Sequence, residues 1–323
     1  MSGPGAIDVH AHYLPETYRS TLLDNGHRQP DGFPQIPSWS AEEHVEAMDR
    51  LGIAISLLSI SSPGVFLGDR AATRDRAREM NEAGRRAVVE HPGRFGLFAS
   101  LPLPDVDAAI AEIAYCCDRL DVAGFALLTN IGGTYLGDPS FRPVFDELDR
   151  RGARVFIHPT SPACWEHTSL GRPRPMLEFF FDTTRTLVDL VLNGTVATHP
   201  GIEFLIPHAG ATLPIVADRV NVFSLLLDVD PAVDVLRDLG RLHFDLAGFP
   251  LPRQLDALLT ITALEHLHYG SDYPFTPEFA AARASEQLME VGDPPGTLVD
   301  TLRINTERLF PALFADQPEG KQT

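Results

Sequence analysis

The sequence contains few cysteines and no long apolar run, and both features narrow its class. Only three of its 323 residues are cysteine, at positions 116, 117 and 164. Three cysteines cannot form a disulfide framework, so a reducing compartment is expected. No apolar run approaches the roughly 20 residues of a membrane span. Residues 1–5 also lack the basic and apolar regions of a signal peptide. We therefore expect a cytoplasmic protein with no membrane partner.

Basic charge is also scarce. The chain has 26 Lys and Arg against 44 Asp and Glu, which gives a net charge of −18. This balance argues against binding to nucleic acids or anionic membranes, because both need a basic surface. An anionic small molecule is still compatible, since nearby arginines can reverse the local field. With 44% hydrophobic and 22% charged residues, the composition is that of a globular protein. The length suits one domain, so we expect residues 1–323 to form a single barrel domain.

Short apolar runs alternate with amphipathic stretches along the whole chain. The expected strands are Ala6–His12, Ile53–Ile60, Phe95–Leu103, Val122–Thr129, Arg154–His158, Ile202–His208, Leu242–Leu246 and Leu267–Ser271. The expected helices are Ala41–Leu51, Arg70–Glu90, Val106–Leu120, Phe141–Arg150, Met176–Asn193, Leu213–Leu227, Pro252–Leu264, Pro277–Val291 and Thr297–Phe310. Buried strands that are each followed by a helix favour an α/β fold, a single (β/α)8 TIM-like barrel with long active-site loops. A doubly wound sheet is the alternative, but no glycine-rich phosphate loop follows any strand.

Residues typical of metal sites stand where the expected strands end. His10 and His12 close the first strand, and alternation places their side chains on the same face, with Val9 on the other. Three more such residues end the fifth, sixth and eighth strands: His158, His208 and Asp272. In a barrel, the carboxyl ends of all strands meet at one rim, where active sites form. Imidazoles with a carboxylate are ligands that suit Zn2+, and Mn2+ is the alternative.

The order of these residues resembles the amidohydrolase superfamily. That family has His-X-His on strand one, single histidines on strands five and six, and an aspartate on strand eight. Four local motifs resemble its aminocarboxymuconate semialdehyde decarboxylase branch: Ile7–Pro15, His208–Ala211, Gly270–Phe275 and Asn305–Phe310. The branch includes aromatic acid decarboxylases that act on resorcylates, carboxyvanillate and methylsalicylate. The resemblance also implies a homodimer.

Two departures refine what the resemblance implies. Binuclear amidohydrolases carry a bridging lysine on strand four, but Gly124–Asn130 contains none, which favours one metal ion per chain. The semialdehyde decarboxylases place an arginine on the first helix, whereas Glu43–Asp49 has none and Arg50 is only a displaced candidate. A monocarboxylated aromatic acid is therefore a better expected substrate than a dicarboxylate.

The resemblance assigns the metal ligands as His10, His12, His158 and Asp272. His208 and Asp272 are then the expected catalytic residues, since they can carry protons beside the metal. Such a site allows either decarboxylation of a hydroxylated aromatic acid, such as 6-methylsalicylate, or hydrolysis or hydration of a lactone, amide or ring-cleavage product. A catalytically silent binding barrel is a third hypothesis. The residues alone do not choose between the two reactions, and the resemblance favours decarboxylation.

Four residues are candidates for binding the substrate. Phe179 is expected to form an aromatic wall, and Arg185 to bind a carboxylate. The competing interpretation of Phe179 is core packing, and that of Arg185 is an ion pair with Asp182. Tyr13 and Trp165 are further candidates to line the pocket. Separately, Asp245, at the end of the seventh strand, is a candidate to orient a ligand histidine.

Overall fold

The computed structural model describes residues 5–227 and 233–314. Segments 1–4, 228–232 and 315–323 lie outside the described residues. The two ends of the expected domain 1–323 therefore lie outside the described residues, and so do four of the five residues 1–5 that lack signal-peptide features. Within the described ranges, no helix combines the length and apolarity needed to cross a membrane.

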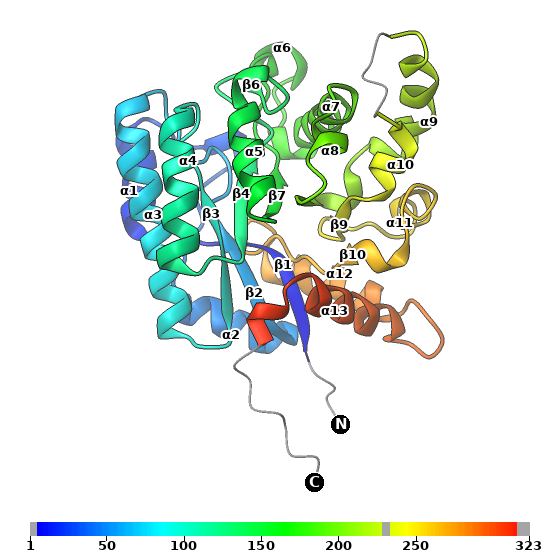
Figure 1. Ribbon diagram of the computed structural model, residues 1–323. Coiled ribbons are helices and arrows are strands. Elements are labelled where there is room, and N and C mark those ends of the chain that lie inside the picture. The colour runs from blue at the N-terminus through cyan, green and yellow to red at the C-terminus, as the bar shows by residue number, and fades with distance from the viewer. Residues whose placement is uncertain (1–4, 228–232, 315–323) are drawn as a thin grey trace.

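Eight parallel strands form the central barrel (Figure 1). In the order in which they pair, they are β1 (Ala6–His12), β2 (Ile53–Ser59), β3 (Phe95–Ser100), β4 (Gly124–Leu128), β7 (Arg154–His158), β8 (Glu203–Ile206), β9 (His243–Asp245) and β10 (Leu267–His268). Bridges from Asp8 to Tyr269 and from Ala11 to Tyr273 join the two ends of the sheet. The Val9 N–H donates to the Tyr269 carbonyl at 2.9 Å across this junction. The expected (β/α)8 architecture is confirmed.

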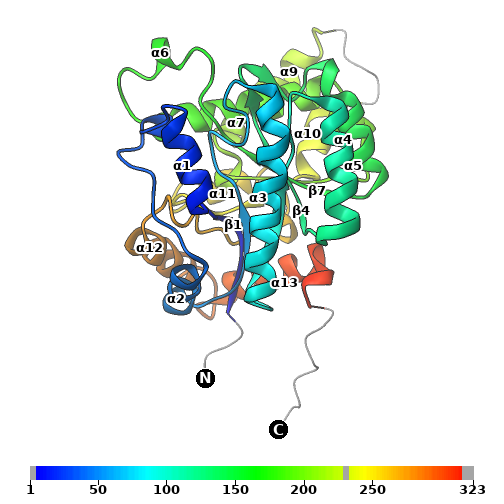
Figure 2. The ribbon, with the colours of Figure 1, turned by 90° about the vertical axis from the view of Figure 1, so that its left-hand side faces the viewer.

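Helices surround the barrel, and α13 lies at the end opposite the α6 loop (Figures 1 and 2). A small antiparallel hairpin, β5 (Asn130–Ile131) and β6 (Thr134–Tyr135), stands beyond β4. The α-helices are α1 (Glu16–Asp24), α2 (Ala41–Leu51), α3 (Arg70–Glu90), α4 (Val106–Tyr115), α5 (Arg142–Arg150), α6 (Trp165–Thr168), α7 (Glu178–Leu192), α8 (Thr195–Thr198), α9 (Leu213–Ser224), α10 (Val235–Gly240), α11 (Gln254–Leu258), α12 (Glu278–Met289) and α13 (Thr297–Leu309).

Where the sequence carries a strong cap, the expected helix boundary is correct. Ser40 accepts a hydrogen bond from the Glu43 N–H at the start of α2, and Gly52 ends that helix at φ 69°. Asp69 caps α3 in the same way. Some boundaries without such caps differ: the expected helix Val106–Leu120 becomes α4 followed by a π turn, and Pro252–Leu264 shortens to α11. Helices α1, α6, α8 and α10 were not expected.

Beneath the rim that holds the histidines, the barrel interior is filled by a cluster of side chains from several strands. Val9, Leu57, Phe98, Phe156 and Leu205 belong to it, together with Leu309 and Phe310 at the end of α13. Simple alternation, which places Val9 on the face opposite His10 and His12, does not hold here, because Val9 packs into this interior cluster. The register of β1 shifts between Asp8 and Ala11, and this irregularity interrupts the simple alternation. Phe156, 4.9 Å from the His10 ring, makes this cluster an apolar floor for the rim above.

Gly124 lets β4 approach β7 closely, and this contact can be tested. A Cβ at Gly124 would lie 2.3 Å from the Arg154 carbonyl oxygen and 3.0 Å from the Phe98 ring. We expect Gly124→Ala to lower the free energy of unfolding by about 1–3 kcal/mol, measured by urea denaturation, because the core is overpacked. Gly240→Ala, whose new methyl would lie 3.3 Å from the Ile261 oxygen, should cost less. Equal effects would contradict the close approach.

Candidate metal centre

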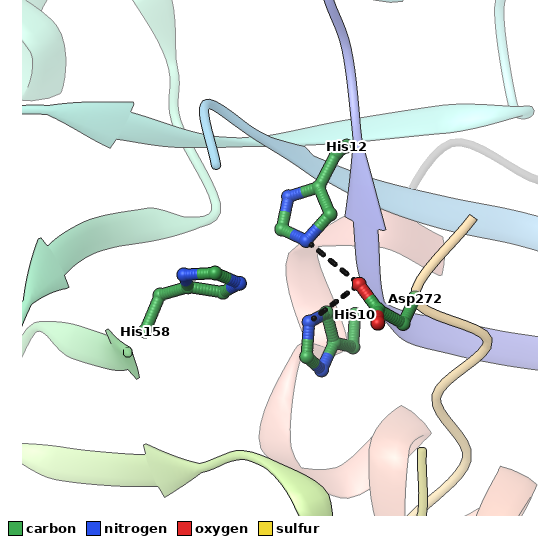
Figure 3. A group of neighbouring side chains, drawn as sticks. All are labelled: His10, His12, His158 and Asp272. Carbon is green, nitrogen blue, oxygen red and sulfur yellow. Dashed lines mark ion pairs between the residues drawn. The ribbon is translucent and has the colours of Figure 1, made fainter. Parts of the chain in front are cut away.

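Four ligand-type side chains converge at the carboxyl ends of their strands. One ligand atom each from His10, His12, His158 and Asp272 lies within 4.8 Å of the others. Asp272 Oδ1 is 3.4 Å from His10 Nε2 and 3.2 Å from His12 Nε2. Figure 3 shows His158 reaching toward these three from its own strand. The structure thus brings together the four residues expected as ligands.

Hydrogen bonds on the far side of the rings set the orientation of the two β1 histidines. His10 Nδ1 lies 2.9 Å from Asp245 Oδ2. This direct contact supports the expected role of Asp245 in orienting a ligand histidine. His12 Nδ1 lies 2.9 Å from Ser59 Oγ, and that hydroxyl donates to the Ala11 carbonyl. A carboxylate can only accept, and a hydroxyl that already donates must also accept, so both Nδ1 atoms carry hydrogen. Both Nε2 lone pairs are therefore free for a metal ion.

His158 follows the same rule. Its Nδ1 lies 2.8 Å from the Pro159 carbonyl oxygen, an acceptor, which leaves Nε2 unprotonated. The Nε2 atoms of His10 and His12 are buried without a hydrogen-bond partner. Buried nitrogens left unpaired are costly unless something else binds them. Three imidazole nitrogens and one carboxylate, anchored from behind, form a donor set that fits one transition-metal ion.

The electrostatics of the group favour a cation at its centre. Burial alone would lower the pKa of His10, but the Asp245 and Asp272 carboxylates raise it to about 10. Burial lowers the pKa of His12, and it lowers that of His158 further. Although burial opposes its charge, the imidazoles of His10, His12 and His208 around it hold the pKa of Asp272 well below its usual range. The buried carboxylates thus attract positive charge, which a bound metal ion would supply in place of a proton.

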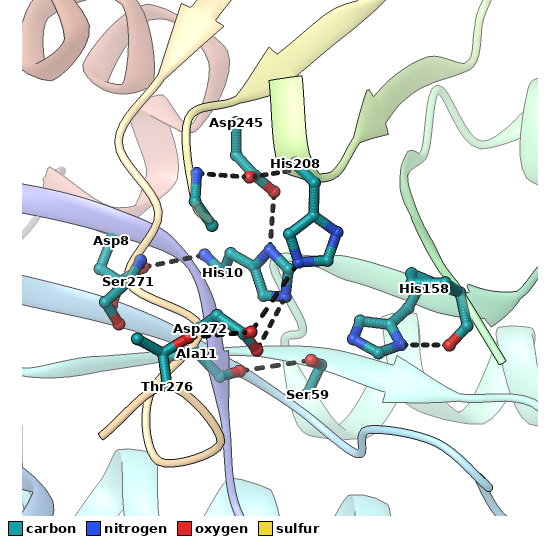
Figure 4. Close-up of polar contacts among 12 residues, drawn as sticks. Asp8, His10, Ala11, Ser59, His158, His208, Asp245, Ser271, Asp272 and Thr276 are labelled. Carbon is teal, nitrogen blue, oxygen red and sulfur yellow. Dashed lines mark hydrogen bonds and ion pairs between the residues drawn. The ribbon is translucent and has the colours of Figure 1, made fainter. Parts of the chain in front are cut away.

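His208 borders this group without joining it (Figure 4). Its Nε2 is 3.8 Å from Asp272 Oδ2, too long for a direct hydrogen bond. The backbone N–H of His208 donates to Asp245 Oδ1 at 3.0 Å, and the Gln254 side-chain amide donates to the backbone carbonyl of His208 at 2.6 Å. The ring stacks on Phe180. His208 and Asp272 have φ of 55° and 58°, a strained conformation for residues with a side chain that is common at functional sites.

A cavity of about 250 Å³ opens above the group, and aromatic rings form much of its wall. Phe179, expected in this role, lines it together with Phe180. Sequence reasoning missed Asp31, Phe33 and Phe275 as lining residues. Phe275 lies within the 270–275 motif, which was a usable signal. Asp31 and Phe33 come from a loop without periodicity.

Three expected substrate residues lie elsewhere. Tyr13 is fully buried, and its hydroxyl donates to the Met80 carbonyl at 2.8 Å, so it faces the core. Arg185 donates to Asp182 at 3.0 Å, which is the ion-pair interpretation, and does not line the cavity. Trp165 lines a neighbouring cavity and stacks on Arg174. These positions correct the expectation that all three line the pocket above the metal ligands.

Comparison with protein families matches the amidohydrolase family over residues 7–312. The chain belongs to this family. It is 34% identical over 328 residues to the 6-methylsalicylic acid decarboxylase acuB of Aspergillus aculeatus, covering 97% of this chain and 98% of that protein. Among solved structures, an amidohydrolase II is 34% identical with a TM-score of 0.90, covering 95% of this chain and 99% of that one.

A more distant structure shares the fold. The dihydroxybenzoic acid decarboxylase from Polaromonas sp. JS666, solved with bound manganese and the inhibitor 2-nitroresorcinol, has a TM-score of 0.78. It is 19% identical and covers 96% of this chain and 97% of that one. At this identity, the likeness concerns the fold alone.

The contact between Asp245 and His10 predicts a defect in metal binding. In Asp245→Asn, the new amide hydrogens face the His10 Nδ1–H, which favours moving the ring proton to Nε2. We expect metal affinity to fall about 10- to 100-fold, measured by chelator competition, with one equivalent of metal in the wild type. Asp256→Asn, an exposed site on α11, is the charge-matched control. Unchanged affinity in Asp245→Asn would show that this contact does not orient the ligand.

Proposed function

We propose that this chain is a metal-dependent, non-oxidative decarboxylase of a hydroxylated aromatic carboxylic acid of the 6-methylsalicylate type. The observation that carries the proposal is the group of three histidines and one aspartate beneath an aromatic cavity. It occurs in a chain 34% identical, along nearly its whole length, to a 6-methylsalicylic acid decarboxylase. No specific observation favours the hydrolase alternative.

His10, His12, His158 and Asp272 would hold one ion per chain, which we propose to be Zn2+. Nitrogen-rich, borderline-soft ligands support zinc. Manganese is the alternative, supported by the manganese in the Polaromonas structure. When bound, the ion supplies positive charge for oxygen anions of the substrate. We further propose that residues 1–323 form one amidohydrolase-type domain, and that the protein is a cytoplasmic homodimer with a small aromatic acid as its partner.

The lining of the cavity explains why the ion is needed. No lysine or arginine is among the described residues that line it, while Asp31 and Asp272 do line it. A substrate carboxylate would therefore meet negative charge unless a cation is bound. Phe33 and Phe275, with ring centroids 5.5 Å apart, and Phe179 and Phe180 offer faces and edges to a planar ring. Arg185 is not part of this proposal.

Proton transfer is proposed for His208 and Asp272. The Asp272 carboxylate faces His208 Nε2 at 3.8 Å, and His208 is the proposed carrier of the proton. His208 then donates to the ring carbon that bears the carboxylate. The bond from that carbon to the carboxylate breaks, its electron pair returns to the ring, and carbon dioxide leaves. The ring hydroxyl assists as electron donor.

The substrate class is tested by product analysis. We expect 6-methylsalicylate to give 3-methylphenol and carbon dioxide in equal amounts, measured by chromatography and mass spectrometry. The analogue 2-methylbenzoate, which lacks the hydroxyl, should not react, because both the electron donor and one oxygen for metal binding are lost. Turnover of lactones or amides without carbon dioxide release would contradict the proposal.

His208→Ala separates proton transfer from metal binding. We expect the metal content to stay near one equivalent, while kcat falls about a hundredfold to ten-thousandfold, as for removal of a general acid. His91→Ala, at the end of α3, is the control and should leave both unchanged. If His208→Ala loses the metal, the residue is a ligand instead.

A further inference from the structure

A second cavity of about 410 Å³ occupies the other half of the barrel mouth. It lies over the ends of β2, β3 and β4 and beside the loop after β7. Of the described residues that line it, none is Asp, Glu, Lys or Arg. Its wall is largely aliphatic and includes Val65, Leu67, Leu101, Leu103, Leu128 and Ile131. The occupant it suits is an uncharged, apolar group.

Two hydrogen-bonded pairs of side chains lie at the boundary between the two cavities. Ser62 lines the cavity above the metal ligands, Thr160 lines the second cavity, and their hydroxyls share a hydrogen bond of 2.6 Å. Asp31 and Ser161 repeat this arrangement, since Ser161 donates to Asp31 across the same boundary. Each pair places one side chain on either side. No aromatic or long aliphatic residue takes part in these two contacts.

Resting on the proposed function, we propose that the second cavity binds an aliphatic chain on the substrate ring. The preferred substrates are then salicylates with an extended alkyl group at position 6, where 6-methylsalicylate carries its methyl. The ring lies above the metal ligands, and the chain passes the Ser62–Thr160 contact. One hydrogen bond between neutral hydroxyls is a small barrier, because such groups contribute modestly. Each methylene buried beyond it strengthens binding about fourfold.

The first test uses the metal-loaded wild-type protein. We expect kcat/KM to rise about fourfold per methylene from the propyl to the pentyl derivative, through a lower KM, relative to 6-methylsalicylate. In parallel, calorimetry measures the Kd of the 3-alkylphenols, which are the products and do not react further. Their Kd should fall with chain length by the same factor.

A matched pair of variants tests whether the preference for longer chains comes from this cavity or only from the greater hydrophobicity of the ligand. Ile131 and Thr134 face each other in the β5–β6 hairpin, but only Ile131 lines the cavity. Ile131→Trp should reduce the preference for pentyl over methyl by tenfold or more, because the indole fills the space. Thr134→Trp should retain the wild-type preference. Thr160→Val, which removes the hydrogen bond between Ser62 and Thr160, should increase the preference.

The outcomes distinguish the two proposals. Suppose that kcat/KM does not rise and Kd does not fall with chain length, while 6-methylsalicylate is turned over. The second cavity would then not be a chain site, and the proposed decarboxylase activity would be unaffected. Absence of turnover for every salicylate would count against the decarboxylase, and the phenol Kd series would still decide the cavity. Equal loss of preference in Ile131→Trp and Thr134→Trp would also overturn it.

Discussion

The carboxylate of Asp245 joins the parts of the site. It is fully buried, with one oxygen facing the His10 ring and the other accepting the backbone N–H groups of His208 and Ala247. A single charge thus orients a metal ligand and positions the proposed proton carrier. Removing one partner from a buried ionic contact costs about 3–5 kcal/mol, because the other charge is left unpaired. The geometry of His10 and that of His208 are therefore coupled.

Closure of the barrel is the second constraint. Asp272 reaches the two β1 histidines because the chain after β10 bonds along β1, with the Asp272 N–H donating to the His10 carbonyl at 2.7 Å. Gly270 allows this approach, since a Cβ there would lie 2.9 Å from His10 Cβ. The strained φ of Asp272 is held by these contacts. The metal ligands are thus a product of long-range strand pairing as much as of local sequence.

Sequence predicted what depends on periodicity and missed what depends on distant contacts. The strands and the ligands His158 and Asp272 follow from apolar runs and their ends. Alternation should also have turned Tyr13, next to His12, away from the site. Asp31 could not be found this way, because a bond from Ser161, 130 residues along the chain, helps to hold it in place. The irregularity in β1, which turns Val9 inward, has no local signal either.

Charge explains the choice of ligands. A divalent ion with three neutral imidazoles and one carboxylate would form a site of net positive charge. Two or more carboxylates would neutralise the charge of the ion. That surplus matters in a chain of net charge −18, whose cavity is lined by two aspartates and no described cation. Binding an anionic aromatic acid here would depend on the ion rather than on surface attraction. Histidine-rich ligation and a pocket whose described lining holds no lysine or arginine therefore complement each other: the aromatic walls would select the ring, and the ion, once bound, would select its carboxylate.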